Sequence, residues 1–199
     1  MSVTLIAGLG NPGREYAGTR HNLGFVVVEA LAAAEGLKWK KESRFESETA
    51  RWDVRSGVTR LLVKPQTFMN ESGRAIRALL DFHKVAPDAC IVAYDDLNID
   101  VGLVKVSVTG SAGGHNGIAS LLEHAGNGFT RYRLGVGGSR PAGMDLKDFV
   151  LGKFTPAEST LINQKLNSLV DGLRLLLNSG PAQAMNLLNR RDTNEPEQA

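Results

Sequence analysis

Short apolar segments rich in β-branched residues alternate along this chain with longer segments whose apolar residues recur at helical spacing. Residues 3–9, VTLIAGL, are almost entirely apolar, which is typical of a strand buried on both faces. Residues 58–64 and 90–94 have the same character, and we expect the second of these strands to end at Asp95 and Asp96. Residues 22–36 and 72–84 carry apolar side chains at the spacing of amphipathic helices, and Asn22 can cap the first of them. This alternation predicts an α/β fold with a mostly parallel sheet.

The same patterns continue toward the C-terminal end. Further strands are expected at residues 38–55, 103–108 and 132–136, and further helices at 118–124, 159–177 and 182–188. The chain has 199 residues, which fits one domain on a prior of roughly 150 residues per domain. We place that domain at residues 1–188 and expect the polar residues 189–199 to form a disordered tail.

The composition limits the kinds of protein that this chain can be. Cys90 is the only cysteine, which excludes an intramolecular disulfide and a Cys-rich zinc site. No apolar run approaches the roughly 18 residues that span a bilayer, and a strand-like run from Val3 leaves no room for a signal peptide. We therefore expect a cytoplasmic protein that does not enter a membrane.

Charge is balanced overall but uneven along the chain. The 23 Lys and Arg residues against 21 Asp and Glu residues give a net charge of +2, which is unlike a histone-type polycation. Residues 38–84, however, hold eleven Lys or Arg and six Asp or Glu residues. This segment predicts a mildly basic face that can attract phosphates.

The glycine-rich loop after the first expected strand has two functional interpretations. GLGNPG at residues 8–13 matches the G-x-G-x-x-G pattern of dinucleotide-binding loops, as in an oxidoreductase. The residues that follow it are typical of a loop, whereas a dinucleotide-binding helix opens inside the glycines. The alternative is that the loop places Asn11 and His21 at the carboxyl edge of the sheet, where α/β proteins bind ligands.

Polar residues follow several of the expected strands or begin the expected helices. His21, Asn70, Asp95 and His115 all occupy such positions, and parallel strands would bring them to one edge of the sheet. Asp95 and Asp96 suit magnesium binding, the capping of a turn, or the orientation of a histidine. Because no further acidic residue lies at an obvious spacing, we favour the histidine partner.

The sequence gives little support to covalent catalysis. Ser111 lies in TGSAG, which lacks the first glycine of a nucleophile elbow, and Cys90 lies in an apolar strand segment, where a core role is typical. The histidines show no zinc-site spacing. By elimination, a hydrolytic reaction would use a water molecule activated by a histidine, without a covalent intermediate.

Six short motifs follow one another along the chain. They are GLGNPG with Tyr16 and TRHN (residues 8–22), KPQTFMN (64–70), DDL (95–97), GSAGGHNG (110–117), RLGVG (133–137) and DFVLGKF (148–154). Together they resemble the motifs of the bacterial-type peptidyl-tRNA hydrolases, in the same order. The resemblance covers about residues 3–188, and the shared order makes it specific.

The resemblance implies hydrolysis of the ester between a peptide and the 3′-terminal ribose of a tRNA, which recycles tRNA from prematurely released peptidyl-tRNA. It also implies a single α/β domain whose mixed, partly parallel, twisted sheet is flanked by helices. Such enzymes typically act as monomers without a metal, a cofactor or an obligate protein partner. His21 matches the catalytic histidine of the family and Asp95 its carboxylate partner. Further matches are the substrate-binding positions Asn11, Tyr16, Met69, Asn70, His115 and Asn116, and the tRNA phosphate-binding positions Lys105 and Arg133.

These residue types suit the chemistry of an ester hydrolase. General-base assistance by His21 would accelerate the attack of water by typically 10²–10⁴-fold. An asparagine amide can donate to the developing oxyanion, and one such donor is worth roughly 3 kcal/mol in a comparable site. Which asparagine serves the oxyanion stays open at this point.

The chain departs from the family pattern at three places. Ser107 stands where many members have a second basic residue, which weakens one expected phosphate contact. Gly138 and Ser139 are inserted before Arg140, and Asn98 replaces a frequent aspartate. An RNA-binding member of the family without catalytic activity is the alternative function.

Overall fold

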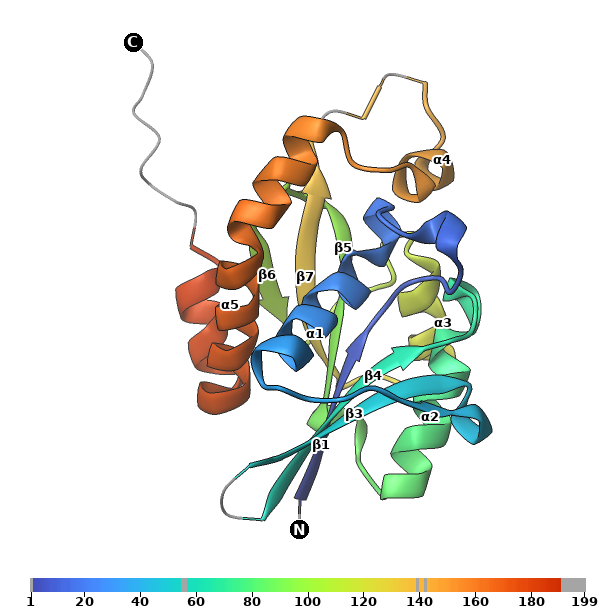
Figure 1. Cartoon of the computed structure of the whole chain (residues 1–199), viewed down its shortest axis with the longest axis vertical. Coiled ribbons are helices and arrows are strands. Elements are labelled where there is room, and N and C mark those ends of the chain that lie inside the picture. The colour runs from blue at the N-terminus through green and yellow to red at the C-terminus, as the bar shows by residue number, and fades with distance from the viewer. Residues whose placement is uncertain (1, 55–56, 139, 142, 191–199) are drawn as a thin grey trace.

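The computed structural model describes residues 2–54, 57–138, 140–141 and 143–190. A seven-stranded sheet in the order β2-β3-β4-β1-β5-β7-β6 forms its centre, with helices on both faces (Figure 1). The strands are β1 (Ser2–Gly8), β2 (Lys40–Glu42), β3 (Ser47–Val54), β4 (Val58–Pro65), β5 (Cys90–Asp100), β6 (Val104–Ser107) and β7 (Thr130–Gly137). The helices are α1 (Leu23–Ala34), α2 (Ser72–His83), α3 (Asn116–His124), α4 (Leu146–Leu151) and α5 (Pro156–Leu188), and η2 (Arg20–Asn22) and η4 (Met69–Glu71) are 3-10 turns.

The sheet is parallel at its centre and antiparallel at its edges. Strands β4, β1, β5 and β7 run parallel, whereas β2, β3 and β6 pair antiparallel. The apolar segments form the parallel strands because helices cover both of their faces. The α/β class and the mixed, partly parallel sheet are therefore confirmed, and the expectation of a mostly parallel sheet holds only for its centre.

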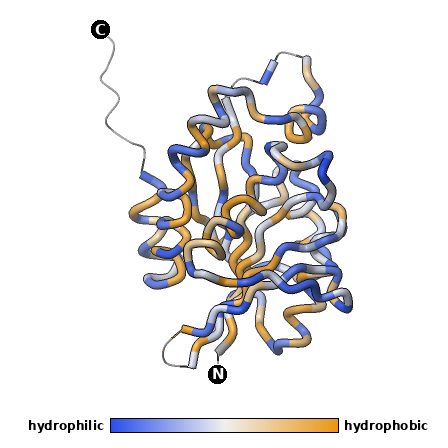
Figure 2. Tube along the Cα trace, viewed as in Figure 1, coloured by the Kyte–Doolittle hydropathy of each residue, from blue (hydrophilic) through white to orange (hydrophobic). Residues whose placement is uncertain are grey.

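Alternate residues of β1 supply two cores on opposite faces of the sheet. Ile6 packs with residues of α1 and α5, whereas Leu5 and Ala7 pack with residues of α2 and α3. Figure 1 shows these two helix layers on either side of the sheet, and Figure 2 shows that hydrophobic residues follow the strands and the helices that pack on them. The period-2 alternation of a strand thus distributes one apolar segment between both cores.

Strand β5 extends further than the sequence predicts. Its pairing with β1 ends at Ala93, but its pairing with β7 continues to Asp100, with a bulge after Asp96. The prediction that the strand ends at Asp95 and Asp96 is wrong, because β7 continues to supply hydrogen bonds on the other side. Both carboxylates therefore stand on a paired strand beyond the end of β1.

The C-terminal helix α5 is one element with a kink. The two helices expected at 159–177 and 182–188 meet at Gly180, whose φ of 77° interrupts the helical backbone ahead of Pro181. Helix α4, which forms one wall of the site described below, was not predicted. Within the described residues, no helix combines the length and apolarity needed to cross a bilayer.

Asn189 follows α5 and bonds the edge strand β6. Its side-chain amide accepts from the N–H of Val106 at 2.7 Å and donates to the C=O of the same residue at 2.9 Å. The remainder of the expected tail, from residue 191 onward, lies outside the described residues.

Candidate active site

His21 and Asp95 meet at the carboxyl edge of the sheet, as the sequence predicts. Nδ1 of His21, in η2, lies 2.9 Å from Oδ1 and 3.0 Å from Oδ2 of Asp95, on β5. Both side chains are buried, with 8% of His21 and 2% of Asp95 exposed. The carboxylate fixes the imidazole proton on Nδ1, which leaves Nε2 of His21 free to accept a proton.

Close packing of α1 on the sheet brings His21 to Asp95. A Cβ on Gly24, at the start of α1, would lie 2.4 Å from the carbonyl oxygen of Ala93 and 2.5 Å from that of Leu9. A larger residue at this position would push α1 away from β1 and β5, and η2 with it. Glycine is required here for close approach.

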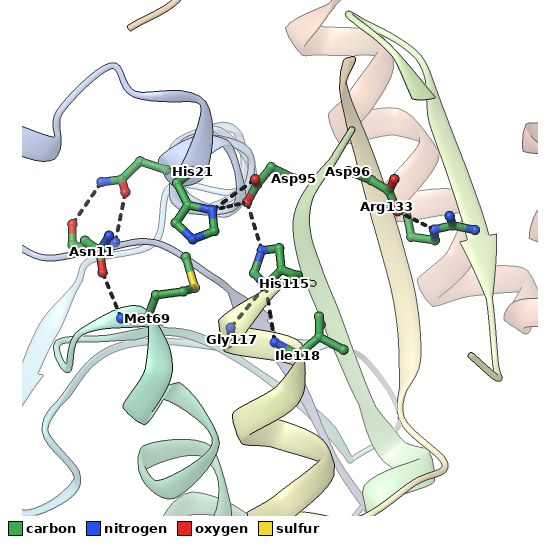
Figure 3. A network of polar contacts seen from close by, with 10 residues as sticks. Asn11, His21, Met69, Asp95, Asp96, His115, Gly117, Ile118 and Arg133 are labelled. Carbon is green, nitrogen blue, oxygen red and sulfur yellow. Dashed lines mark hydrogen bonds and ion pairs between the residues drawn. The ribbon is translucent and has the colours of Figure 1, made fainter. Parts of the chain in front are cut away.

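His115 is a second imidazole on the same carboxylate (Figure 3). Its Nε2 lies 3.0 Å from Oδ1 of Asp95, and its Nδ1 accepts from the backbone N–H groups of Gly117 and Ile118 at 3.1 and 3.2 Å. Because Nδ1 is an acceptor, the ring proton lies on Nε2 and points at Asp95. His115 therefore orients the carboxylate, a contact that the sequence, which placed it only among substrate-binding residues, did not predict.

Asp95 is held in its ionised form. Burial alone would raise the pKa of its carboxyl group, but the contacts with His115 and His21 lower it more. The net effect is a pKa well below the ordinary value. Asp95 is thus a permanent acceptor for both rings at neutral pH.

The cluster of His21, Asp95 and His115 has the residue types of a metal site, and their ligand atoms lie within 4.8 Å of one another. The hydrogen bonds argue against a resident cation. A metal on Nε2 of His115 requires that nitrogen to be unprotonated, yet Nδ1 of the same ring already accepts two backbone N–H groups. A neutral ring cannot do both, since it carries one proton.

Three hydrogen bonds, two to Asn22 and one to Met69, hold Asn11 in place. Its backbone N–H donates to Oδ1 of Asn22 at 2.8 Å, and its C=O accepts from Nδ2 of Asn22 at 2.9 Å. Its side-chain Oδ1 accepts from the N–H of Met69 at 2.7 Å, so Nδ2 is the group left to donate to a ligand. The prediction that Asn22 caps α1 is wrong, because its amide braces the Asn11 loop instead.

A cleft of about 1340 Å³ opens over this cluster. Its lining includes all the substrate-binding residues that the resemblance implies, namely Asn11, Tyr16, Met69, Asn70, His115 and Asn116. Asn11 and Met69 are buried, whereas Asn70 and Asn116 are exposed. Phe68, for which the sequence indicated no role, is 59% exposed in the cleft and meets the Tyr16 ring edge-on, with 6.4 Å between the ring centres.

The two expected phosphate-binding residues are cross-strand neighbours, but only one lines the cleft. Lys105 on β6 stands opposite Arg133 on β7, and Arg133 is part of the lining. Nε of Arg133 donates to Oδ2 of Asp96 at 2.8 Å. Arg140 also lines the cleft and donates to the C=O of Met144, whereas the inserted Ser139 lies outside the described residues.

Five of the eleven basic residues at 38–84 form ion pairs with acidic groups. The ion pairs are Lys40–Glu42, Arg51–Asp53, Lys64–Glu29, Lys64–Glu48, Arg74–Glu46, Arg74–Glu71 and Arg77–Asp81. All the acidic partners except Glu29 belong to the same stretch, so its excess of positive charge stays close to that of the sequence.

Arg20 is a buried residue next to His21 that sequence reasoning missed. Its guanidinium donates to the C=O of Lys153 at 2.8 Å and to Glu158 at 2.7 Å, and its plane lies over the ring of Phe149 at 4.2 Å. These contacts tie η2 to the end of α4 and the start of α5. The sequence signal is only its place in TRHN, since nothing in that motif indicates burial.

Comparisons with known proteins decide the family. Residues 5–196 match the family model described as "Peptidyl-tRNA hydrolase". The chain belongs to the peptidyl-tRNA hydrolase family. The peptidyl-tRNA hydrolase of Synechococcus sp. (strain JA-3-3Ab) is 44% identical, over 99% of this chain and 87% of that protein. The one from Synechocystis sp. (strain ATCC 27184 / PCC 6803 / Kazusa) is 42% identical, over 94% and 96%. The crystal structure of peptidyl-tRNA hydrolase from Acinetobacter baumannii superposes with a TM-score of 0.85 at 36% identity, covering 94% of each chain.

Membership of the peptidyl-tRNA hydrolase family confirms the resemblance and fixes the reaction, which is hydrolysis of peptidyl-tRNA. The structure also excludes the interpretation of GLGNPG as a dinucleotide-binding loop. Helix α1 begins only at Leu23, so no helix opens inside the glycines as dinucleotide binding requires. A Cβ on Gly10 would lie 2.8 Å from the ring of Phe25, so this glycine serves packing.

Proposed function

We propose that His21 is the general base of peptidyl-tRNA hydrolysis and that Asp95 orients it. The observation that carries the proposal is the contact of both Asp95 oxygens with Nδ1 of His21, at 2.9 and 3.0 Å. This contact leaves Nε2 as the basic atom at the cleft. It also stabilises the imidazolium that forms when Nε2 takes up a proton.

The reaction then proceeds in two proton transfers. Nε2 of His21 takes a proton from a water molecule as the water oxygen bonds to the ester carbonyl carbon. The tetrahedral intermediate collapses, the bond from the carbonyl carbon to the ribose oxygen breaks, and His21 returns its proton to that oxygen. The products are a peptide carboxylic acid, which loses its proton to solvent at neutral pH, and a tRNA with a free ribose hydroxyl. No covalent enzyme intermediate is needed.

Asn11 is proposed as the donor to the developing oxyanion. It is the buried one of the four asparagines that line the cleft, and the N–H of Met69 fixes its amide so that Nδ2 is the available donor. A donor that is already oriented loses no free energy to reorganisation when charge develops. The exposed Asn70 and Asn116 are proposed to bind peptide backbone groups or the tRNA 3′ end.

The remaining cleft residues, and Lys105 beside them, are proposed to bind the two halves of the substrate. Tyr16 and Met69 contact the peptide and the 3′ end, and Lys105 and Arg133 bind phosphates of the acceptor end. His115 contributes by orienting Asp95. Since every group in this scheme comes from one chain, we propose that the enzyme acts as a monomer without an obligate protein partner. Because peptidyl-tRNA arises in translation, the enzyme is proposed to recycle tRNA in the cytoplasm.

The test is the release of the acyl group from an N-acetyl-aminoacyl-tRNA by the wild type and by His21→Ala, assayed side by side in EDTA. We expect rapid wild-type turnover and a loss of about 10²–10⁴-fold in kcat for the variant. Activity that survives in His21→Ala would overturn the proposed base. A wild type that binds tRNA without hydrolysing the ester would favour the non-catalytic RNA-binding alternative.

A further inference from the structure

Two consecutive carboxylates on β5 hold two different functional groups. Asp95 accepts from His21, and Asp96 accepts from Nε of Arg133 at 2.8 Å. Successive side chains of a strand point to opposite faces, and Figure 3 shows the two carboxylates on opposite sides of β5. Both still line the one cleft, because β1 stops pairing with β5 at Ala93.

The contact with Asp96 uses only one of the three guanidinium nitrogens of Arg133. Among the described residues, the only hydrogen bond of the Arg133 side chain is the one from Nε to Asp96. Its two terminal nitrogens, which form the fork that binds a phosphate through two parallel N–H groups, have no partner within that part of the chain. The Arg133 side chain is 29% exposed and that of Asp96 only 10%. The carboxylate is therefore the more firmly held partner of the ion pair.

Asn98 holds Asp96 in turn. Oδ1 of Asp96 accepts from the backbone N–H of Asn98 at 2.9 Å and from its Nδ2 at 3.2 Å. These bonds lie where the pairing of β5 with β7 shifts register after Asp96. The aspartate that is frequent at this position in the family could not donate through its side chain. The asparagine at position 98 of this chain therefore gives Asp96 a hydrogen bond that an aspartate there could not give.

We propose that Asp96 is a positioning residue that fixes the separation between the phosphate-binding fork of Arg133 and the ester at His21. Neighbouring Cα atoms of a strand lie 3.80 Å apart, so Asp95 and Asp96 anchor the two groups to adjacent points of one rigid element. A tRNA phosphate held by Arg133 then places the ester in register with His21. This inference rests on the proposed phosphate-binding role of Arg133.

The charge of Asp96 and its positioning role have opposite effects on substrate binding. Loss of a negative charge near the cleft, taken alone, strengthens the attraction of a polyanion and lowers KM. Loss of the anchor of Arg133 raises KM. Asp100→Asn is the matched control, because Asp100 is an exposed residue of the same strand and makes no ion pair among the described residues.

The experiment compares the wild type, Asp96→Asn, Asp100→Asn, Arg133→Ala and the double variant Asp96→Asn/Arg133→Ala. Each is assayed on N-acetyl-aminoacyl-tRNA and on N-acetyl-aminoacyl-adenosine, which keeps the ester but lacks the RNA backbone. We expect Asp96→Asn to raise KM for the tRNA substrate about fivefold, with kcat within about twofold, and to leave hydrolysis of the adenosine ester unchanged. The double variant should be no weaker than Arg133→Ala, because the two residues act as one unit.

The outcomes separate this inference from the proposed function. If Asp96→Asn lowers KM as Asp100→Asn does, or if its effect adds in full to that of Arg133→Ala, Asp96 acts only through its charge and the inference is wrong. If Arg133→Ala leaves KM for the tRNA substrate unchanged, the proposed role of Arg133 fails first. Asn98→Ala provides a second route should Asp96→Asn fold poorly. It removes the Nδ2 donor to Asp96 without changing the charge, and we expect a smaller rise in KM for the tRNA substrate alone.

Discussion

The hydrolytic centre and the rim of the cleft differ in how firmly their side chains are held. At the centre, His21, Asp95 and Asn11 are buried, and each has a partner that fixes its orientation. At the rim, Asn70 and Asn116 are exposed. In the proposed function, the centre acts on the same ester in every substrate, whereas the rim must accept peptides of any sequence. Rigid groups suit the first task and adaptable groups the second.

This difference predicts how substitutions divide between kinetic constants. Oriented groups at the centre stabilise the transition state, so their loss should lower kcat. Exposed groups at the rim contribute binding that is much the same in the ground and transition states, so their loss should raise KM. The following variants test whether that division holds.

Asp95→Asn should have the largest effect. An amide offers one oxygen to two imidazole N–H groups, and its NH₂ facing Nδ1 of His21 favours the tautomer whose Nε2 is protonated and cannot accept from water. We expect kcat on N-acetyl-aminoacyl-tRNA to fall by about 10³–10⁴-fold with a small change in KM. Asp100→Asn is the control. If Asp95→Asn changes KM alone and leaves kcat as in the control, the centre does not differ from the rim.

Asn11→Asp should have the next largest effect. The new carboxylate still accepts from the N–H of Met69 but has no N–H to give to an oxyanion. We expect kcat to fall by about 10²–10³-fold. Asn163→Asp, an exposed change on α5, is the matched control for the added charge. Equal kcat in the two variants would remove Asn11 from the oxyanion role.

Lys105→Ala should act on binding, and more weakly. Lys105 is half-buried on the edge strand beside Arg133 and does not line the cleft. We expect KM to rise about fivefold, equivalent to roughly 1 kcal/mol, with kcat unchanged. If the enzyme neutralises about three phosphates, log K against log salt has a slope of about −2 to −3, and this variant lowers its magnitude by about 1. Lys38→Ala, exposed elsewhere on the chain, should change neither, and a loss of kcat in Lys105→Ala would place Lys105 in the chemistry.

The pH dependence of stability should show the smallest effect. Because the folded pKa of Asp95 lies below its ordinary value of 3.8, its ionised form stabilises the fold fully above that pH. The stabilisation is lost as the pH falls through the folded value. Urea unfolding at pH 6, 4 and 3 should therefore show the free energy of unfolding of the wild type falling more steeply than that of Asp95→Asn below about pH 4. Parallel curves would mean that the two histidines do not stabilise the carboxylate.

The sequence predicts the central sheet and the residues of the centre because both depend on local patterns. Apolar runs such as residues 3–9 indicate buried strands, and His21 and Asp95 follow them in motifs. The rest depends on contacts between distant segments. Nothing local in Asn22 shows that it braces Asn11 rather than capping α1, and nothing in TRHN shows that Arg20 is buried against α4 and α5. The continuation of β5 to Asp100 likewise depends on hydrogen bonds that β7 supplies from far along the chain.

The central claim is that His21 and Asp95 act as one unit, and a double-variant cycle tests it most directly. Single-turnover rates on N-acetyl-aminoacyl-tRNA would be measured in EDTA for the wild type, His21→Ala, Asp95→Asn and the double variant. We expect the double variant to be no slower than His21→Ala, because Asp95 acts only through the ring that is absent. Losses that multiply, so that the double variant is slower than His21→Ala by the full Asp95→Asn factor, would contradict this claim and give Asp95 a separate role.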